Sequence, residues 1–187
     1  MKRLFVAIKF CPDENTLREY NLLRSRLQFS QIRWVEPDKF HLTLKFIGNI
    51  SDEKIPNITD VINNTLKSFD PFHIQLGNLG IFGSTYQPRV IWLGINDKSS
   101  INKLGIAILS GFDKAGFGYD RQNFVPHISL GRISKVVDKT LFNKQLDKSR
   151  SVFKQTMYVN KVFLIESVLQ TKGSIYTDIY TCPLTLL

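Results

Sequence analysis

Two short stretches of the chain share one pattern of polar and apolar positions. HLTLKF occupies 41–46 and HISLGR occupies 127–132, so each begins with histidine, an apolar residue, a hydroxyl residue and leucine. Side chains at positions i and i+2 of a β-strand lie on the same face. Each stretch therefore predicts a strand that presents one imidazole and one hydroxyl on one face and buries apolar residues on the other.

The rest of the chain predicts an alternation of strands and helices. Short runs rich in β-branched and aromatic residues predict strands, and runs with apolar residues at helical spacing behind Pro12 or Ser51 predict helices. The strands are expected over 3–10, 40–48, 71–83, 88–95, 125–133, 155–169 and 174–184, and the helices over 12–27, 51–69, 99–116 and 138–146. Residues 33–40 are expected to form a loop, and residues 80–87 a glycine-rich connection.

The order of elements is similar in the two halves of the sequence, and each half holds one of the histidine stretches. This similarity favours an internal duplication. No segment rich in proline and serine separates the halves. The sequence therefore predicts an α+β protein in which residues 1–187 form one domain with two pseudo-symmetric lobes.

The chain is basic, with 25 Lys and Arg against 16 Asp and Glu and a net charge of +9. This excess favours nucleic acid or another phosphorylated ligand, and a solvated basic surface is the alternative. The first apolar run is too short for a secretory signal, and no run approaches the ~20 apolar residues of a membrane span. Cys11 and Cys182 form neither a metal-ligand spacing nor a disulfide framework. We expect a reduced, cytoplasmic protein with no membrane partner.

Two imidazoles and two hydroxyls suit acid–base catalysis on a phosphate. Histidine has an ordinary pKa of about 6.5, so one of His41 and His127 can act as base while the other is protonated. The hydroxyls of Thr43 and Ser129 can donate hydrogen bonds to phosphate oxygens. One such pair on a strand is more often structural, but these two stretches hold two of only three histidines. The third, His73, is expected to be structural.

Other chemistries fit the two stretches less well. Neither stretch has a nearby carboxylate or cysteine, whereas zinc sites use three or four protein ligands. A nucleophilic Ser129 would need the glycine pattern of a nucleophile elbow, which does not surround it. We therefore expect neither a metal nor another cofactor.

At this point the sequence resembles the two-histidine phosphoesterase superfamily, and specifically the RNA 2′,3′-cyclic phosphodiesterases historically called 2′-5′ RNA ligases. The resemblance rests on RLFVAI, HLTLKFIG, GIFGSTYQPRVIWLGI, PHISLGR and ESVLQTKGSIY, which lie in the family's order over nearly the whole chain. It implies a bilobal α+β fold in which two antiparallel sheets with outer helices flank a positively charged central cleft. It also implies opening of terminal 2′,3′-cyclic phosphates to 2′-phosphates, and reversible 2′-5′ joining of tRNA halves.

The resemblance further implies roles for individual residues. The proton donor falls on His41, the proton acceptor on His127, and the phosphate contacts on Thr43, Ser129 and Arg132. Strict alternation would place Arg132 on the face opposite His127. Contact with the phosphate therefore requires the strand to bulge or end near Gly131.

The expected partner is single-stranded RNA ending in a 2′,3′-cyclic phosphate, such as a tRNA half, bound by a monomer. Phe46 or Trp34 is available for stacking on a base. Two alternatives stay open. One is a module that binds RNA or a nucleotide without turnover, and the other is a two-histidine phosphodiesterase that acts on 2′-5′ oligoadenylate or a cyclic nucleotide.

Overall fold

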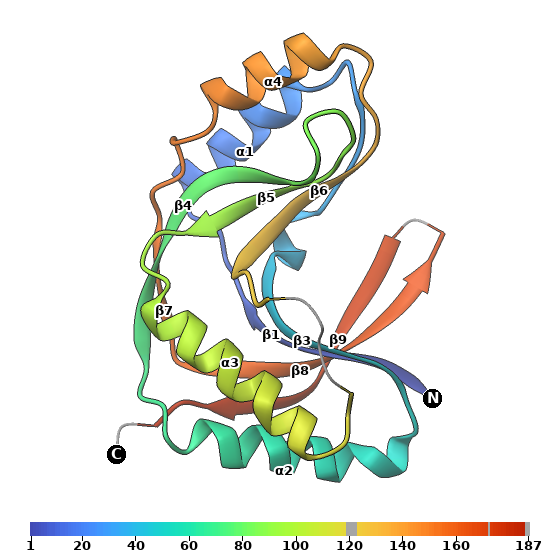
Figure 1. Cartoon of the computed structure of the whole chain (residues 1–187), viewed down its shortest axis with the longest axis vertical. Helices are drawn as coiled ribbons and strands as arrows, with labels where there is room; N and C mark the ends of the chain where they lie inside the picture. Colours follow the sequence, from blue (N-terminus) through green and yellow to red (C-terminus); the bar gives the residue numbers. More distant parts are fainter. Residues whose placement is uncertain (119–122, 172, 186–187) are drawn as a thin grey trace.

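The computed structural model describes residues 1–118, 123–171 and 173–185 and contains a strongly curled antiparallel sheet with helices on its outer side (Figure 1). The strands are β1 (Lys2–Lys9), β2 (Gln31–Trp34), β3 (His41–Ile50), β4 (Phe72–Gly83), β5 (Pro88–Ile95), β6 (His127–Lys135), β7 (Thr156–Val159), β8 (Lys161–Gln170) and β9 (Gly173–Pro183). The helices are α1 (Glu14–Arg26), α2 (Ile55–Leu66), α3 (Ser99–Lys114) and α4 (Lys139–Lys148), with short 3₁₀ turns at Pro37–Lys39 and Asp52–Lys54.

The strand order is β7-β4-β5-β6-β3-β1-β8-β9, with β2 paired to the free side of β6. The two histidine strands, β3 and β6, meet in the middle of this order through the single residue pair Leu42 and Ile128. On each side of that pair lie three further strands in the order. The expected two antiparallel sheets are therefore the two halves of one curled sheet, joined at β3 and β6.

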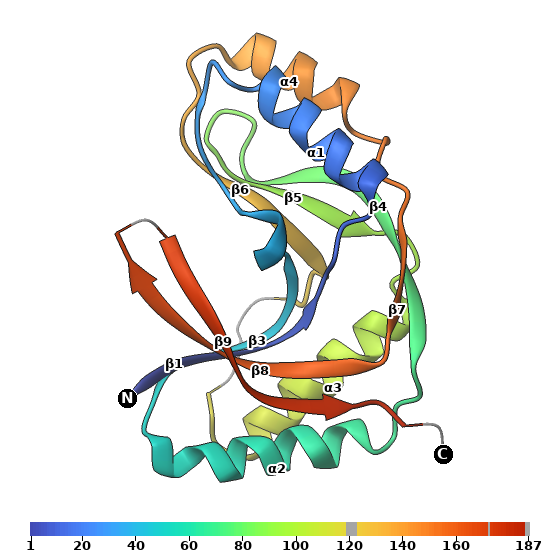
Figure 2. The same ribbon diagram turned by 180° about the vertical axis from the view of Figure 1, so that it is seen from behind.

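The two halves of the sheet are built from interleaved parts of the sequence. One half contains β1, β3, β8 and β9 with helices α2 and α3 on its outer side, and the other contains β2, β4, β5, β6 and β7 with α1 and α4 (Figures 1 and 2). Helix α1 follows β1 in sequence but packs over the other half of the sheet. Helix α3 follows β5 in sequence but packs over the half that contains β3. The lobes thus do not correspond to the N-terminal and C-terminal halves of the chain.

Capping and burial explain why the helices form where they do. Asp13 accepts a hydrogen bond from the Thr16 amide at the start of α1, and Asp138 caps α4 through the Leu141 amide. The helices bury their apolar faces in one large core with the outward-facing residues of the strands. Val6 and Leu42 from the sheet and Phe112 from α3 have no exposed surface in this core.

Three expectations from the pattern need correction. Residues 33 and 34, expected in the loop over 33–40, belong to strand β2, because residues 31–34 pair with the free edge of β6. The expected strand over 155–169 is two strands, β7 and β8, which break at Asn160 and pair in opposite halves of the sheet. Residues 80–83 belong to β4, so the connection to β5 contains only 84–87.

Candidate active site

The two imidazoles and two hydroxyls of the histidine stretches lie around one residue pair in the middle of the sheet. Leu42 on β3 pairs with Ile128 on β6, and both are fully buried in the core. The residues on either side of this pair must therefore face the concave side of the sheet, away from the helices. These are His41 and Thr43 on β3, and His127 and Ser129 on β6.

Each imidazole is held by a carbonyl two residues earlier in the chain. Nδ1 of His41 lies 2.8 Å from the carbonyl oxygen of Lys39, and Nδ1 of His127 lies 2.7 Å from that of Val125. Because a carbonyl can only accept, Nδ1 of each ring carries a proton. Nε2 of each ring is then the atom that gives or takes a proton during a reaction.

Both imidazoles have lowered pKa values. Burial is the main cause for each ring, and the carbonyl bond opposes it by favouring the protonated form. The charge of His127 further lowers the pKa of His41. Because this Coulomb interaction is reciprocal, the two rings favour a state in which at most one carries a proton.

Both strands bulge directly after the hydroxyl residue. The pairing of β6 with β5 shifts by one residue between Trp92–Ser129 and Ile91–Gly131, and the pairing of β3 with β1 shifts between Ala7–Thr43 and Val6–Lys45. A bulge of this kind reverses the alternation of the residues after it. It turns Arg132 and Phe46, the corresponding residues of the two stretches, toward the concave face, and both side chains are exposed. The condition for Arg132 to share a face with His127 is met.

An aromatic pair packs beside His41. The ring centroid of Phe5 lies 5.0 Å from that of His41, and Tyr176 meets the imidazole edge-on at 5.3 Å. Phe5 is 3% exposed and belongs to a small apolar cluster on the concave face, with Ala7, Phe163 and Ile165. These residues remove water from one side of the His41 ring, which explains the lowered pKa of that residue.

A second aromatic pair packs beside His127. Phe82 meets this imidazole edge-on at 4.7 Å, and Trp92 lies 6.1 Å away. The indole of Trp92 lies so close to Gly80 that a Cβ on that glycine would come within 2.2 Å of the ring. Sequence reasoning missed both aromatic pairs. One of these residues could have been predicted. The alternation of PRVIWLGI indicates the face of Trp92, which pairs with Ser129 on the concave side.

Trp34 lies on the other side of the sheet. It pairs with Gly131, and its ring meets Tyr20 of α1 edge-on at 5.7 Å. This packing in the helix layer contradicts the expectation that Trp34 is available to stack on a base. The neighbouring Arg33, which the sequence did not single out, pairs with Arg132 and shares its face. Phe46, which is 61% exposed, remains as the aromatic candidate.

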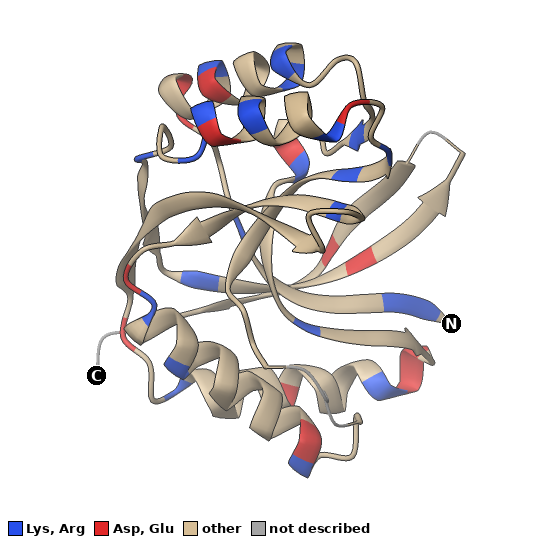
Figure 3. Ribbon diagram, turned by 45° about the horizontal axis from the view of Figure 1, so that its top comes forward, with Lys and Arg blue, Asp and Glu red and all other residues tan. Residues whose placement is uncertain are grey.

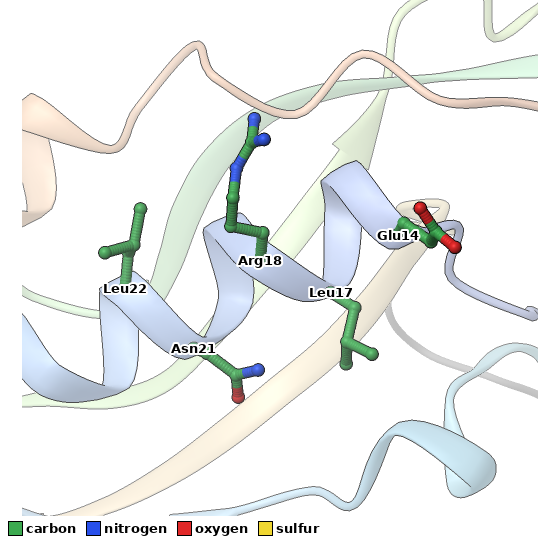
Figure 4. Close-up of a pocket in the computed structure, with 5 residues that line it drawn as sticks. All are labelled: Glu14, Leu17, Arg18, Asn21 and Leu22. Carbon is green, nitrogen blue, oxygen red and sulfur yellow. The ribbon is translucent and has the colours of Figure 1, made fainter.

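The other candidate features lie away from the two histidines. His73 is exposed on β4 and packs against Tyr158, with ring centroids 4.8 Å apart. Among residues 1–118, 123–171 and 173–185, no group of three or more His, Cys, Asp and Glu side chains is placed to hold a metal ion. None of the helices described is long and apolar enough to cross a membrane. A shallow depression on α1, around Leu17 and Leu22, lies on the exposed outer surface of the helix (Figure 4).

Comparison with known proteins places the whole chain in one family. Residues 11–92 match the family described as LigT like Phosphoesterase. A protein of Methanothermobacter thermautotrophicus named RNA 2′,3′-cyclic phosphodiesterase is 30% identical over 94% of this chain and 95% of its own length, and one of Archaeoglobus fulgidus with the same name is 29% identical over 95% and 97%.

Solved structures agree with this placement. LigT of E. coli in its apo form superposes with a TM-score of 0.76 at 25% identity, covering 99% of this chain and 98% of the other. A Thermus thermophilus protein, TT0787, has the same fold with a TM-score of 0.77 at 23% identity over 97% of each chain. The fold matches these solved structures, and the sequence matches the family over most of its length. The chain belongs to the LigT-like phosphoesterase family.

Proposed function

We propose that this chain is an RNA 2′,3′-cyclic phosphodiesterase that opens the cyclic phosphate to a 2′-phosphate by acid–base catalysis. The observation that carries the proposal is the arrangement of His41 and His127. They lie on one face of the sheet, around the Leu42–Ile128 pair, and both have Nδ1 fixed by a carbonyl. The relatives named RNA 2′,3′-cyclic phosphodiesterase support the substrate class.

Within this proposal, His127 is neutral and His41 is protonated when the substrate binds. Nε2 of His127 takes a proton from water as the water oxygen bonds to phosphorus. The bond from phosphorus to the ribose 3′-oxygen breaks, and Nε2–H of His41 donates its proton to that oxygen. The product carries a 2′-phosphate and a free 3′-hydroxyl, and the two rings have exchanged their protonation states.

The remaining groups stabilise charge on phosphorus. The hydroxyls of Thr43 and Ser129 share the face of the two imidazoles, and Arg132 reaches the same face after its bulge. Hydrogen bonds from these groups strengthen as negative charge develops in the transition state. If a 5′-hydroxyl of another RNA takes the place of water, the same steps form a 2′-5′ linkage, which accounts for ligase activity.

The anionic substrate also explains how a buried imidazole becomes protonated. In the free protein, burial lowers the pKa of His41 below its ordinary value of 6.5. A bound phosphate adds negative charge beside the ring and raises that pKa again. Within the proposal, tRNA halves and other single-stranded RNA ends in the cytoplasm are the substrates, and the chain acts as a monomer.

The experiment uses a short RNA that ends in a 2′,3′-cyclic phosphate, incubated with the protein in excess EDTA. We expect a 2′-phosphate product, identified by ³¹P NMR against synthetic 2′- and 3′-phosphate standards. His41→Ala should lower turnover about 10²- to 10⁴-fold, while His73→Ala, which changes the exposed histidine outside the site, should retain it. Binding without hydrolysis would identify the chain as a binding module, and cleavage of 2′-5′ oligoadenylate alone would assign it to a different substrate.

A further inference from the structure

A pocket of about 680 Å³ opens on the sheet beside the start of β3. Its lining includes Lys9 of β1, Lys161 and Phe163 of β8, and Asp178 of β9. Strands β1, β8 and β9 lie side by side in the half of the sheet that holds His41 (Figures 1 and 2). The pocket thus lies next to the proposed active site without including its histidines.

The register of the strands places the lysines on the same face as the proposed catalytic groups. Lys9 pairs directly with His41, as Ala7 pairs with Thr43. Paired residues of neighbouring strands project from one face of the sheet. Lys161 lies two residues before Phe163, which belongs to the apolar cluster on the concave face. Both ammonium groups are therefore on the concave side, beyond His41 as seen from His127.

Both ammonium groups lie near the ring of Phe163. Nζ of Lys9 lies 4.8 Å from the centre of the ring, and Nζ of Lys161 lies 5.5 Å from it. An anion that lies between the two lysines places negative charge near both ammonium groups. Asp178 supplies part of that charge, since its carboxylate lies 2.6 Å from Nζ of Lys9. This ion pair is partly exposed, so another anion can replace the carboxylate at low cost.

The order of the strands gives the path of the nucleotide. In the proposed mechanism, phosphorus lies between His127 on β6 and His41 on β3, and the ribose, whose 3′-oxygen His41 protonates, lies on the β3 side. The next groups toward the 5′ end are C4′, C5′ and the 5′-phosphate. The next strands beyond β3 are β1 and β8, which carry Lys9 and Lys161.

We propose that Lys9 and Lys161 form a subsite for the 5′-phosphate of the nucleotide that carries the cyclic phosphate. The inference rests on the proposed function and on the assignment of His41 to the leaving oxygen. The 5′-phosphate displaces Asp178 from Lys9 and bridges the two ammonium groups over Phe163. A second acid, Asp38, lines the pocket and limits the net positive charge there. The enzyme is thereby selective for the end of an RNA strand over an isolated nucleoside cyclic phosphate.

The test compares adenosine 2′,3′-cyclic phosphate with the same compound carrying a 5′-phosphate. We expect the 5′-phosphate to raise kcat/KM about tenfold or more, the gain of a charge-assisted hydrogen bond. Lys9→Gln and Lys161→Gln should each reduce this ratio, and the double variant should bring it to about one. Asp178→Asn should raise the ratio, because the competing carboxylate is removed. The ratio cancels any general loss of activity.

Lys2→Gln is the matched control. Lys2 is also on β1 and also pairs with a carboxylate, that of Glu166 at 2.7 Å, but it faces the helix side of the sheet together with Leu4. Its loss should leave the ratio unchanged. A ratio of one in the unmodified protein, or a ratio that survives the double variant, would overturn the subsite.

A binding measurement separates this inference from the proposed function. Adenosine 2′,5′-bisphosphate should bind more tightly than adenosine 2′-phosphate by calorimetry, and the double variant should lose the difference. This comparison needs no turnover. Equal binding of the two ligands to the unmodified protein contradicts the subsite even if the cyclic phosphate is hydrolysed. An inactive protein that still prefers the bisphosphate keeps the subsite and contradicts the proposed hydrolysis.

Discussion

The two histidine strands are nearly equivalent in their first three residues and differ beyond them. On β3 and on β6, the histidine Nδ1 bonds a carbonyl two residues earlier, a hydroxyl residue lies two positions later on the same face, and the strand then bulges. An aromatic pair covers each ring, Phe5 with Tyr176 and Phe82 with Trp92. The duplicated part is therefore the part to which we assign the proton transfers and the contacts with phosphate oxygens.

The residues after the bulge give the two strands different surroundings. Lys45 on β3 is buried and donates a hydrogen bond to the carbonyl of Gly118, a few residues after the end of α3. The corresponding Gly131 leaves room for β2, since a Cβ there would come within 2.8 Å of Ile32. One position further, Phe46 on β3 corresponds to Arg132 on β6.

This difference gives the symmetric site a direction. An arginine beside His127 suits the phosphate oxygens, and an exposed phenylalanine near His41 suits the base or ribose of the nucleotide. Figure 3 shows Lys and Arg on strands and helices in both halves of the molecule. Within the proposed function, a few side chains next to the two equivalent histidines set the direction of the substrate.

The largest expected effect comes from removing either histidine. His41→Ala and His127→Ala should each lower kcat on the natural cyclic phosphate about 10²- to 10⁴-fold, since each removes one proton transfer. A nitrophenyl phosphodiester has a leaving group that needs no proton. His41→Ala should therefore recover most of its activity on this substrate, while His127→Ala should remain slow because water still lacks its base.

The rescue pattern distinguishes the two strands in a way that the structure alone does not. Recovery of His127→Ala instead of His41→Ala would exchange the roles and reverse the direction of the substrate. Retention of activity by both variants on the natural substrate would remove the two stretches from the active site.

The next largest effect concerns the corresponding residues after the bulge. Arg132→Gln should lower kcat/KM about 10- to 100-fold, the loss of a charge-assisted hydrogen bond to the phosphate. Arg33→Gln is the matched control, because Arg33 pairs with Arg132 and carries the same charge on the same face. If the two variants lose activity equally, Arg132 acts only through the general positive potential. Phe46→Leu should instead weaken binding of RNA, measured as a higher KM.

The pH dependence should report the coupling between the two rings. Burial lowers both pKa values below 6.5 in the free protein, and the active form needs one ring protonated. We therefore expect kcat/KM to decrease about tenfold per pH unit above 6.5, while kcat decreases only at higher pH because bound phosphate raises the pKa. His127→Gln removes the opposing charge and should raise the pKa of His41, measured by NMR titration. An unchanged His41 pKa would show that the rings are not coupled.

The aromatic pair beside His127 should tolerate no added volume beneath Trp92. Gly80→Ala places a Cβ within 2.2 Å of the indole, and overpacking of this kind costs about 1–3 kcal/mol. The displaced indole should disturb His127 and lower kcat several-fold. Gly111→Ala is the control, because its Cβ meets Thr65 at 2.7 Å between α2 and α3, away from the site. Equal losses of kcat in both variants would mean that Trp92 only stabilises the fold.

The sequence predicted the fold class and the two histidine strands because alternation and local composition determine both. It did not predict the short strand β2 or the break at Asn160, since these depend on which sheet edge each segment pairs with. The aromatic pairs around the histidines come from β1, β4, β5 and β9, so no local pattern connects them. The prediction for Trp34 was wrong because the face on which its side chain lies depends on the pairing of β2 with β6, which the local sequence does not show. We propose that residues 1–187 act as one domain, in which the pairing of β3 with β6 connects the two halves of the sheet.

The smallest expected effects come from the two hydroxyl residues, which occupy equivalent places on β3 and β6. Thr43→Val keeps the β-branched shape and deletes the hydroxyl, so it should lower kcat about fivefold or more, the value of about 1 kcal/mol for one neutral hydrogen bond. Ser129→Thr keeps the hydroxyl and adds a methyl group that restricts χ1, so its kcat should stay close to that of the unmodified protein. Single-turnover rates on the cyclic phosphate measure both. Full activity in Thr43→Val would remove that hydroxyl from the mechanism. A large loss in Ser129→Thr would show that the two strands are less equivalent than their backbones suggest, because a methyl group that β3 accepts would then be excluded on β6.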